Sequence, residues 1–194
     1  VETSRKRIRI QWGQFLLNDM LTSRYRTLVC GVNPVDNSHG IISLIADALP
    51  ASQWDNESIT KYAKGYAELS PDKTLVLKYD MDDVKVFALL RPLHREEFTM
   101  GDFKTGFEKV AQMLEGRRDR MPMASVSFLG GKSNRLVDAD GNEPSFETVI
   151  RTMYEAGYRG DVYPSVRMWE LAPTGVFATY PFPDSLKVMR AGGS

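Results

Sequence analysis

The chain has 194 residues, of which 42% are hydrophobic and 26% are charged, and 25 basic residues balance 25 acidic ones. A chain of this length and composition buries a hydrophobic core without disulfides or structural metals. Its net charge of zero excludes global steering towards nucleic acid or an anionic membrane, so either partner would need a local charged patch. We expect one domain over residues 1–194, because no Ser-, Gly- or Pro-rich linker divides the sequence.

Cysteine usage and hydropathy narrow the expected location. The single cysteine, Cys30, excludes an internal disulfide and favours a reducing compartment, so we expect a cytoplasmic protein. No apolar run reaches the roughly 18 residues of a membrane span. Polar residues interrupt the apolar residues at the start of the chain, whereas a signal peptide would have a continuous apolar core there. Because the chain opens with Val1 rather than Met, we expect a processed, tagged or excised piece of a longer protein.

The first third of the chain predicts one strand among three helices. The N-terminal segment 1–23 has apolar residues at helical spacing, which predicts an amphipathic helix over residues 4–22. Residues 26–33 are a short apolar run typical of a strand, and a polar loop leads from them into a helix over 41–49. Apolar steps of three and four residues predict a further helix over 57–69.

Residues 74–91 are expected to be the hairpin around which the sheet is built. Apolar residues alternate with others on both sides of an acidic tip at residues 81–83, which is the pattern of two antiparallel strands joined by a tight turn. One face of each strand is predicted to be apolar. The side chains concerned are Leu75, Leu77 and Tyr79, followed by Val84, Val86, Ala88 and Leu90.

The second half of the chain predicts two capped helices among short strands. Thr99 or Asp102 is expected to cap the first helix, and Ser145 the second, which Gly157 ends. Strands are predicted at residues 123–129, 162–171 and 176–180, with a brief strand or edge at 135–137, and residues 183–194 are expected to form a frayed tail.

This element order indicates a fold class. From the first strand to the fourth it is β-α-(α)-β-β-α-β, the order of a ferredoxin-like fold. We therefore predict an α+β sandwich with a mainly antiparallel sheet, extended by a C-terminal helix and strand pair, with helices packed on it.

The strand, loop and helix around residues 30–39 form the best candidate for a ligand site. A helix that opens behind a strand presents free backbone N–H groups and a favourable dipole to an anion. The expected ligand is therefore a small anion, phosphorylated or nucleotide-like. The candidate binding residues are Asn33, Asp36, Ser38 and His39, together with Lys132 and Arg135 from a later loop.

Catalytic and metal-binding patterns fail on spacing, so the catalytic residues stay unknown. Cys30 and His39 offer a nucleophile and a base, but a cysteine inside an apolar strand is more typical of a core residue. The GGKS sequence at residues 130–133 lacks the first glycine and the following helix of a phosphate loop. Residues 138–143 do not match an EF-hand loop, and two histidines alone cannot form a zinc site. We therefore predict neither a metal nor a cofactor.

Aromatic residues gather near the end of the chain, in a composition typical of protein interfaces. Among them, Trp169, Tyr180 and Phe182 are expected to form an interaction surface. The first functional hypothesis is therefore a non-enzymatic interaction or accessory module of a larger cytoplasmic protein or assembly, with a protein partner or self-association.

Two alternatives stay open beside that hypothesis. The first is an enzyme or sensor that binds the small anionic ligand at residues 30–39. The second is nucleic-acid binding through basic loops such as Arg117, Arg118 and Arg120. It ranks third, because the predicted strands lack the aromatic pairs on which bases stack.

Overall fold

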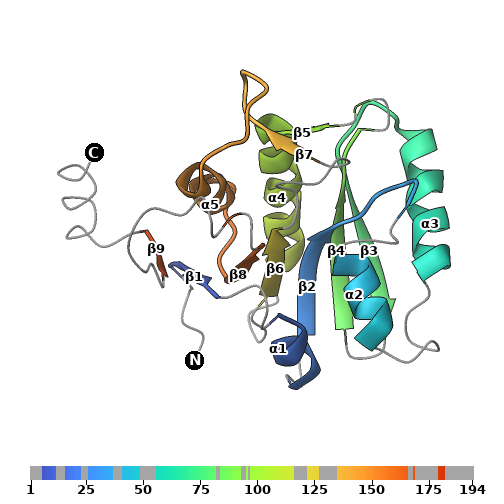
Figure 1. The fold of residues 1–194 in the computed structure, drawn as a ribbon, viewed down its shortest axis with the longest axis horizontal. Helices are drawn as coiled ribbons and strands as arrows, with labels where there is room; N and C mark the ends of the chain where they lie inside the picture. The colour runs from blue at the N-terminus through green and yellow to red at the C-terminus, as the bar shows by residue number, and fades with distance from the viewer. Residues whose placement is uncertain are drawn as a thin grey trace.

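Within the described residues, seven strands form one sheet at the centre of the molecule (Figure 1). The computed structural model describes residues 6–11, 16–22, 26–36, 41–48, 56–81, 84–92, 95, 97–115, 122–126, 135–165, 168 and 179–181. In order along the sheet the strands are β3 (Leu75–Met81), β4 (Val84–Leu90), β2 (Arg26–Gly31), β6 (Pro122–Val126), β8 (Asp161–Pro164), β1 (Ile8–Ile10) and β9 (Thr179–Tyr180). A separate pair joins β5 (Glu97–Thr99) to β7 (Arg135–Val137).

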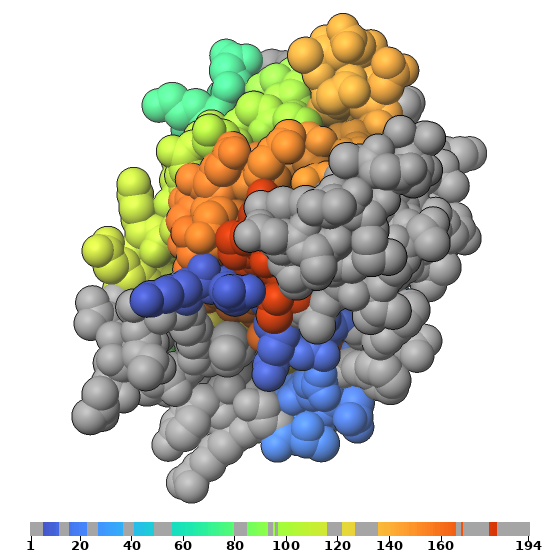
Figure 2. Space-filling model, turned by 90° about the vertical axis from the view of Figure 1, so that its left-hand side faces the viewer, coloured from blue at the N-terminus to red at the C-terminus, as the bar shows by residue number. Residues whose placement is uncertain are grey.

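The central strands of this sheet run parallel. β2 is parallel to both β4 and β6, and β8 is parallel to both β6 and β1. The outer pairs β3/β4 and β1/β9 are antiparallel. β1 and β9 lie at one end of the sheet in Figure 1, and in Figure 2 the blue residues of β1 lie beside the red ones of β9. In this register Val29 of β2 lies opposite Phe87 of β4 and Ala124 of β6. The carboxyl ends of β4, β2, β6, β8 and β1 therefore share one edge.

Helices cover both faces of the sheet (Figure 1). One face packs against α1 (Leu16–Thr22), α2 (Ile41–Ala48) and α3 (Asn56–Leu69), and the other against α4 (Met100–Leu114) and α5 (Phe146–Glu155). Neighbouring residues of β2 point to opposite faces of the sheet. Leu28 and Cys30 belong to the core under α1, α2 and α3, and Val29 belongs to the core under α4 and α5. Each fully buried aliphatic side chain contributes about 1.5–3 kcal/mol. None of the helices in the described ranges is long and apolar enough to cross a membrane.

The predicted ferredoxin-like, mainly antiparallel α+β sandwich is wrong. The structure has a mixed, mostly parallel sheet with helices on both sides, which is an α/β arrangement. A parallel strand covered on both faces shows an apolar run instead of alternation. Every residue of β6 is buried, and so is every residue of β8, which is the physical reason that their sequences show no alternating pattern.

The predicted helix over residues 4–22 is also wrong in its first half. Ile8 and Ile10 lie in β1 and are buried, while Arg9 between them is exposed. Arg9 holds this short strand to β8, since its Nε and Nη2 donate to the Asp161 carboxylate at 3.0 and 2.8 Å. These hydrogen bonds raise the pKa of Arg9 above its ordinary value. Among the described residues of this segment, only those of α1, at its end, are helical.

The hairpin over residues 74–91 is confirmed, although it lies at the edge of the described sheet. β3 and β4 are antiparallel, with Leu75 opposite Leu90 and Met81 opposite Val84. Leu77, Val86, Ala88 and Leu90 share one core cluster, as the alternation predicted. β2, β6 and β8 are each paired on both sides with parallel neighbours, so the centre of the sheet lies at these strands and not at the hairpin.

The helix caps predicted in the second half of the chain are confirmed. The Thr99 hydroxyl accepts a hydrogen bond from the Asp102 N–H at 3.1 Å, and Ser145 accepts one from Thr148 at the same distance. Gly157 follows α5 with a φ of 100°, a conformation that favours glycine. Strands occur at β6, β7, β8 and β9. The predicted strand over 162–171 is confirmed only to Pro164, since Ser165 lies outside β8 and Met168 is helical. The predicted stretches 127–129, 166–167, 169–171 and 176–178 and the tail 183–194 lie outside the described residues.

Replacing Thr27 with valine is expected to raise the free energy of unfolding by about 1 kcal/mol. Thr27 is 1% exposed, and its hydroxyl has no hydrogen-bond partner within the part of the chain that the structure describes. Burying an unpaired hydroxyl costs about 1–3 kcal/mol, and valine has nearly the same shape. Urea unfolding measures the change. Thr27→Ser, which keeps the hydroxyl and removes the methyl group, should lower stability, and a less stable valine variant would contradict the expectation.

Candidate functional site

The shared carboxyl edge of the parallel strands carries polar residues from four of them. Gln11 follows β1, Asn33 lies two residues beyond β2, Arg91 follows β4 and Ser165 follows β8. Backbone hydrogen bonds between neighbouring strands extend as far as these polar residues. For example, the Ser165 N–H donates to the Val126 carbonyl oxygen at 3.1 Å. In open α/β sheets, ligands bind in the crevice outside the carboxyl ends of the strands. This edge is therefore the candidate site.

Asn33 fixes the start of the loop that leaves β2. Its side chain is 8% exposed, and its Oδ1 accepts hydrogen bonds from the backbone N–H groups of Val35 at 2.8 Å and Asp36 at 3.3 Å. A side-chain oxygen that bonds to backbone two residues ahead forms an Asx turn, which holds the chain in a tight bend. The bend leaves Val35 and Asp36 exposed at the edge of the sheet.

The loop then leads to α2, which packs against the sheet through Ile42 and Ile45. Free N–H groups in the first turn of a helix attract anions. The structure therefore has the strand, turn and helix that the sequence predicted at this place. Ser38 and His39 lie outside the described residues, so their part in a site stays a prediction.

Sequence reasoning missed Arg91. The residue is 7% exposed, and its guanidinium Nη1 donates to the Pro92 carbonyl oxygen at 3.1 Å. Gly31 of β2 lies opposite Leu89 of β4, so Asn33 and Arg91 lie two residues further along neighbouring strands. A guanidinium stays protonated across physiological pH and therefore gives this edge a positive charge. The available signal was an arginine directly after the apolar run of β4.

Within the described residues, the structure does not bring the other predicted anion-binding residues next to Asn33. Arg135 is the first residue of β7 and lies opposite Glu97 of β5, in the separate two-stranded sheet. Figure 1 places this small sheet at the end of the molecule where the loop after β2 emerges. Lys132 lies outside the described residues. Both assignments stay predictions.

The carboxylate of Asp102 fixes the start of α4, the helix beside this small sheet. Asp102 accepts hydrogen bonds from the hydroxyl groups of Thr99 at 2.8 Å and Thr74 at 3.1 Å. Arg95 forms an ion pair with the same carboxylate at 2.9 Å. These contacts join the start of α4 to the residue before β3, so we interpret Asp102 as structural. Within the described ranges, no group of three or more histidine, cysteine, aspartate or glutamate residues could hold a metal ion.

Cys30 does not act as a nucleophile in this structure. The residue lies inside β2, is 1% exposed and belongs to the core beneath α1, α2 and α3. Burial raises the pKa of its thiol to about 12, so the reactive thiolate is absent near neutral pH. The prediction that Cys30 is a core residue is confirmed.

We expect Cys30 to resist a thiol-modifying reagent at pH 8 in the folded protein. Because this is the only cysteine of the chain, the absorbance of a chromogenic disulfide reagent reports on it alone. Modification should be complete in denaturant and slower by at least about a hundredfold in buffer, since it requires local or global opening. Rapid modification of the folded protein would contradict the buried position.

Of the three residues predicted to form an aromatic interaction surface, the structure describes Tyr180 alone. Tyr180 of β9 is half-buried, and its ring centroid lies 5.3 Å from that of Tyr154 on α5. Tyr180 therefore makes an internal contact between the sheet edge and a helix. Trp169 and Phe182 lie outside the described residues, as do Arg117, Arg118 and Arg120.

The amino-acid sequence matches no family model and no curated protein. Its fold is similar to the macrodomain of Thermus aquaticus DarG, with a TM-score of 0.50 and 15% identity, over 81% of this chain and 96% of that one. The macrodomain of Mycobacterium tuberculosis DarG (TM-score 0.49, 16% identity, 80% and 95% covered) and a macrodomain protein from Streptomyces coelicolor (0.46, 11%, 80% and 97%) are also similar. The fold assignment rests on the first of these.

The comparison assigns a macrodomain-like fold: a mixed, mostly parallel sheet of seven described strands with helices on both sides. It also corrects the expected function. The first hypothesis, a non-enzymatic interaction or accessory module of a larger cytoplasmic assembly, is contradicted by the macrodomain neighbours.

Proposed function

We propose that this chain binds a small anionic, nucleotide-like ligand of the ADP-ribose class at the carboxyl edge of its parallel strands. Macrodomains bind ADP-ribose and related ligands, and the fold of this chain is macrodomain-like. The observation that carries the proposal is Asn33, whose buried side chain holds Val35 and Asp36, just after β2, in a defined turn. The sequence alone had favoured an anion at the same place.

The chemistry of this edge suits a diphosphate. A loop held at its start by Asn33 loses little conformational freedom when it closes on a ligand, which preserves binding energy. The first turn of α2 offers backbone N–H groups to phosphate oxygens. Arg91 adds a positive charge at the end of the neighbouring strand. These groups recognise phosphate, so affinity should depend on the phosphates of the ligand.

Calorimetric titration of the full chain tests the proposal. ADP-ribose and ADP are expected to give saturable binding heats, whereas adenosine, which has the same base and sugar without phosphates, should give none. Binding of adenosine as tight as that of ADP-ribose, or no binding by either nucleotide, would contradict the proposal. A protein partner, a cytoplasmic location and the extent of a single domain remain predictions from the sequence.

A further inference from the structure

The carbonyl oxygen of Pro92 accepts hydrogen bonds from both Arg91 and Arg95. Arg91 follows β4 and is buried, and its Nη1 donates to this oxygen at 3.1 Å. The backbone N–H of Arg95 donates to the same oxygen at 3.2 Å. A carbonyl oxygen has two lone pairs, so it accepts both hydrogen bonds at once. The place of the Arg91 guanidinium therefore depends on how Arg95 holds Pro92.

The side chain of Arg95 is held by two contacts with Asp102. Its Nη2 donates to Oδ1 at 3.0 Å, and its Nη1 lies 2.9 Å from Oδ2. Two parallel bonds between a guanidinium and a carboxylate fix their orientation as well as their distance. Single exposed ion pairs contribute little, and bidentate pairs are the exception. Arg95 is therefore fixed, although its side chain is 45% exposed.

Asp102 is fixed in turn by the start of α4. Its carboxylate accepts hydrogen bonds from the hydroxyl groups of Thr99 at 2.8 Å and Thr74 at 3.1 Å. Its backbone N–H donates to the Thr99 hydroxyl at 3.1 Å. The Asp102 side chain is only 15% exposed, and hydrogen bonds shielded from water are stronger than exposed ones. Asp102 is therefore a fixed point to which Arg95 is tied.

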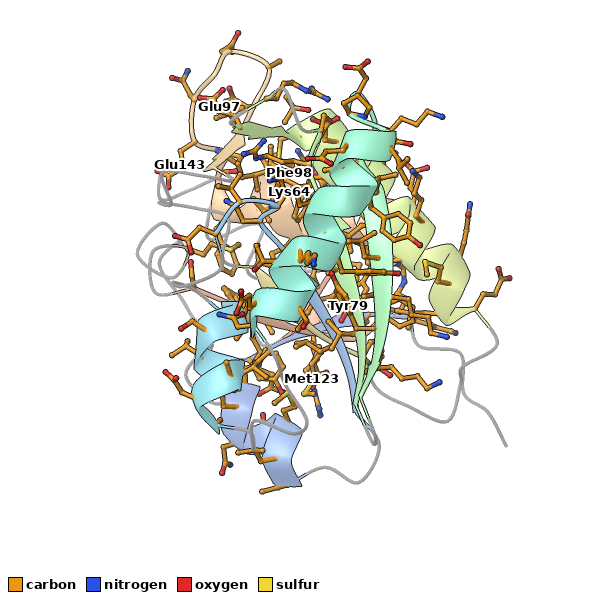
Figure 3. The ribbon with its side chains drawn as sticks, turned by 90° about the vertical axis from the view of Figure 1, so that its right-hand side faces the viewer. Lys64, Tyr79, Glu97, Phe98, Met123 and Glu143 are labelled. Atoms are coloured by element: carbon orange, nitrogen blue, oxygen red, sulfur yellow. The ribbon has the colours of Figure 1, made fainter. Side chains whose placement is uncertain are left out.

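β5, which lies between Arg95 and Asp102 in the chain, is anchored in the core. Phe98 is fully buried, and its ring packs edge to face against Phe103 of α4 with centroids 6.5 Å apart. Figure 3 labels Phe98 and its exposed neighbour Glu97 on this strand. The ion pair of Arg95 with Asp102 thus rests on a part of the chain that is packed against α4.

We propose that Asp102 and Arg95 are positioning residues for Arg91. They hold the Pro92 carbonyl oxygen in place, and that oxygen holds the guanidinium that supplies positive charge to the phosphates of the ligand. The two residues act through Arg91 and not by touching the ligand. A guanidinium that is fixed before binding loses little freedom on binding, so affinity increases. This inference rests on the proposed function, because it deepens the account of the same site.

The mobility of the Arg91 side chain tests the positioning without any ligand. Nuclear magnetic resonance relaxation of arginine Nε–H groups in the full chain measures it, and the Arg91 signal is identified by its loss in Arg91→Lys. We expect an order parameter near the roughly 0.85 of rigid groups, which falls towards about 0.6 or below in Arg95→Gln. An Arg91 signal that stays equally rigid in Arg95→Gln would overturn the proposal.

Arg95→Gln is expected to weaken ADP-ribose binding by about fivefold to tenfold, because the ligand must then order Arg91 itself. Arg151→Gln is the matched control, since it removes an arginine of similar exposure, 48% against 45%, from an ion pair with Glu155 on α5. The control should bind as the unchanged chain does. Calorimetric titration measures both affinities, and equal losses in the two variants would overturn the proposal.

A double-mutant cycle shows whether Arg95 acts through Arg91. With Arg91→Gln in place, adding Arg95→Gln should weaken binding by less than about twofold further, because the group that was positioned is gone. A fully additive loss would mean that Arg95 contacts the ligand and would overturn the proposal.

A second cycle leaves Arg91 unchanged, so it serves where Arg91→Gln unfolds the protein or binds too weakly to measure. Arg95→Gln and Asp102→Asn break the same ion pair, and the double variant should bind no more weakly than the weaker single one. No ADP-ribose binding by the unchanged chain would overturn the proposed function. Binding by that chain with the same affinity in Arg95→Gln would overturn only the positioning of Arg91.

Discussion

Replacing Asn33 with alanine is expected to abolish detectable binding of ADP-ribose and to lower the free energy of unfolding by about 1–3 kcal/mol. The change removes the oxygen that accepts hydrogen bonds from the N–H groups of Val35 and Asp36. Because Asn33 is 8% exposed, water replaces those bonds poorly and the cost of unpaired groups applies. The loop that is proposed to hold phosphate then loses its fixed start. Calorimetric titration and urea unfolding measure the two effects.

A second variant at the same position separates the turn from the ligand. Asn33→Asp keeps an oxygen that can accept both hydrogen bonds, so stability should change by less than about 1 kcal/mol. The added negative charge should repel a nearby phosphate and weaken binding by at least about tenfold. An affinity for ADP-ribose that is unchanged in both variants would place the ligand away from this edge and contradict the proposed site.

Elements fixed by local chemistry could be predicted from the sequence. The caps at Thr99 and Ser145 depend on a side chain and an N–H group three residues apart. The hairpin of β3 and β4 depends on alternation across a short tip. In each case the interacting residues are close along the chain, so a short window of sequence contains the whole interaction.

Strand direction could not be predicted in the same way. β2 pairs with β4 and β6, which are distant in sequence, and its buried run is compatible with parallel or antiparallel neighbours. β1 has only three residues, and the bond that holds it joins Arg9 to Asp161 at the other end of the chain. Spacing alone does not distinguish such a strand from the first turn of a helix.

The residues of the candidate site also differ in whether their signal was local in the sequence or depended on strand pairing. Asn33 was found because it follows a strand and precedes a helix, which is a local signal. Arg91 becomes a neighbour only through the pairing of β2 with β4, so the wrong sheet hid it. The ferredoxin-like interpretation predicted a mainly antiparallel sheet, in which neighbouring strands end at opposite edges, and therefore gave no shared carboxyl edge at which polar residues could meet.

Replacing Gly160 with alanine is expected to lower the free energy of unfolding by about 2–4 kcal/mol. A Cβ atom there would lie 2.6 Å from Cγ of Pro122 and 2.9 Å from both the Pro122 carbonyl oxygen and the Tyr158 hydroxyl. That hydroxyl is buried and lies 2.7 Å from the Asp161 carbonyl oxygen, to which it donates. Overpacking costs about 1–3 kcal/mol and a lost hydrogen bond about 1 kcal/mol more.

The effect should be large because this point joins three strands of the sheet. The Gly160 carbonyl oxygen accepts a hydrogen bond from the Arg9 N–H at 2.9 Å, while Pro122 begins β6 and Asp161 begins β8. The rigid ring and the carbonyl oxygen of Pro122, together with the hydrogen-bonded Tyr158 hydroxyl, leave the new methyl group little room. Gly101→Ala on α4, where the nearest atom is 3.8 Å away, is the matched control and should not destabilise the protein. Equal urea midpoints for the two variants would contradict this account of β1, β6 and β8.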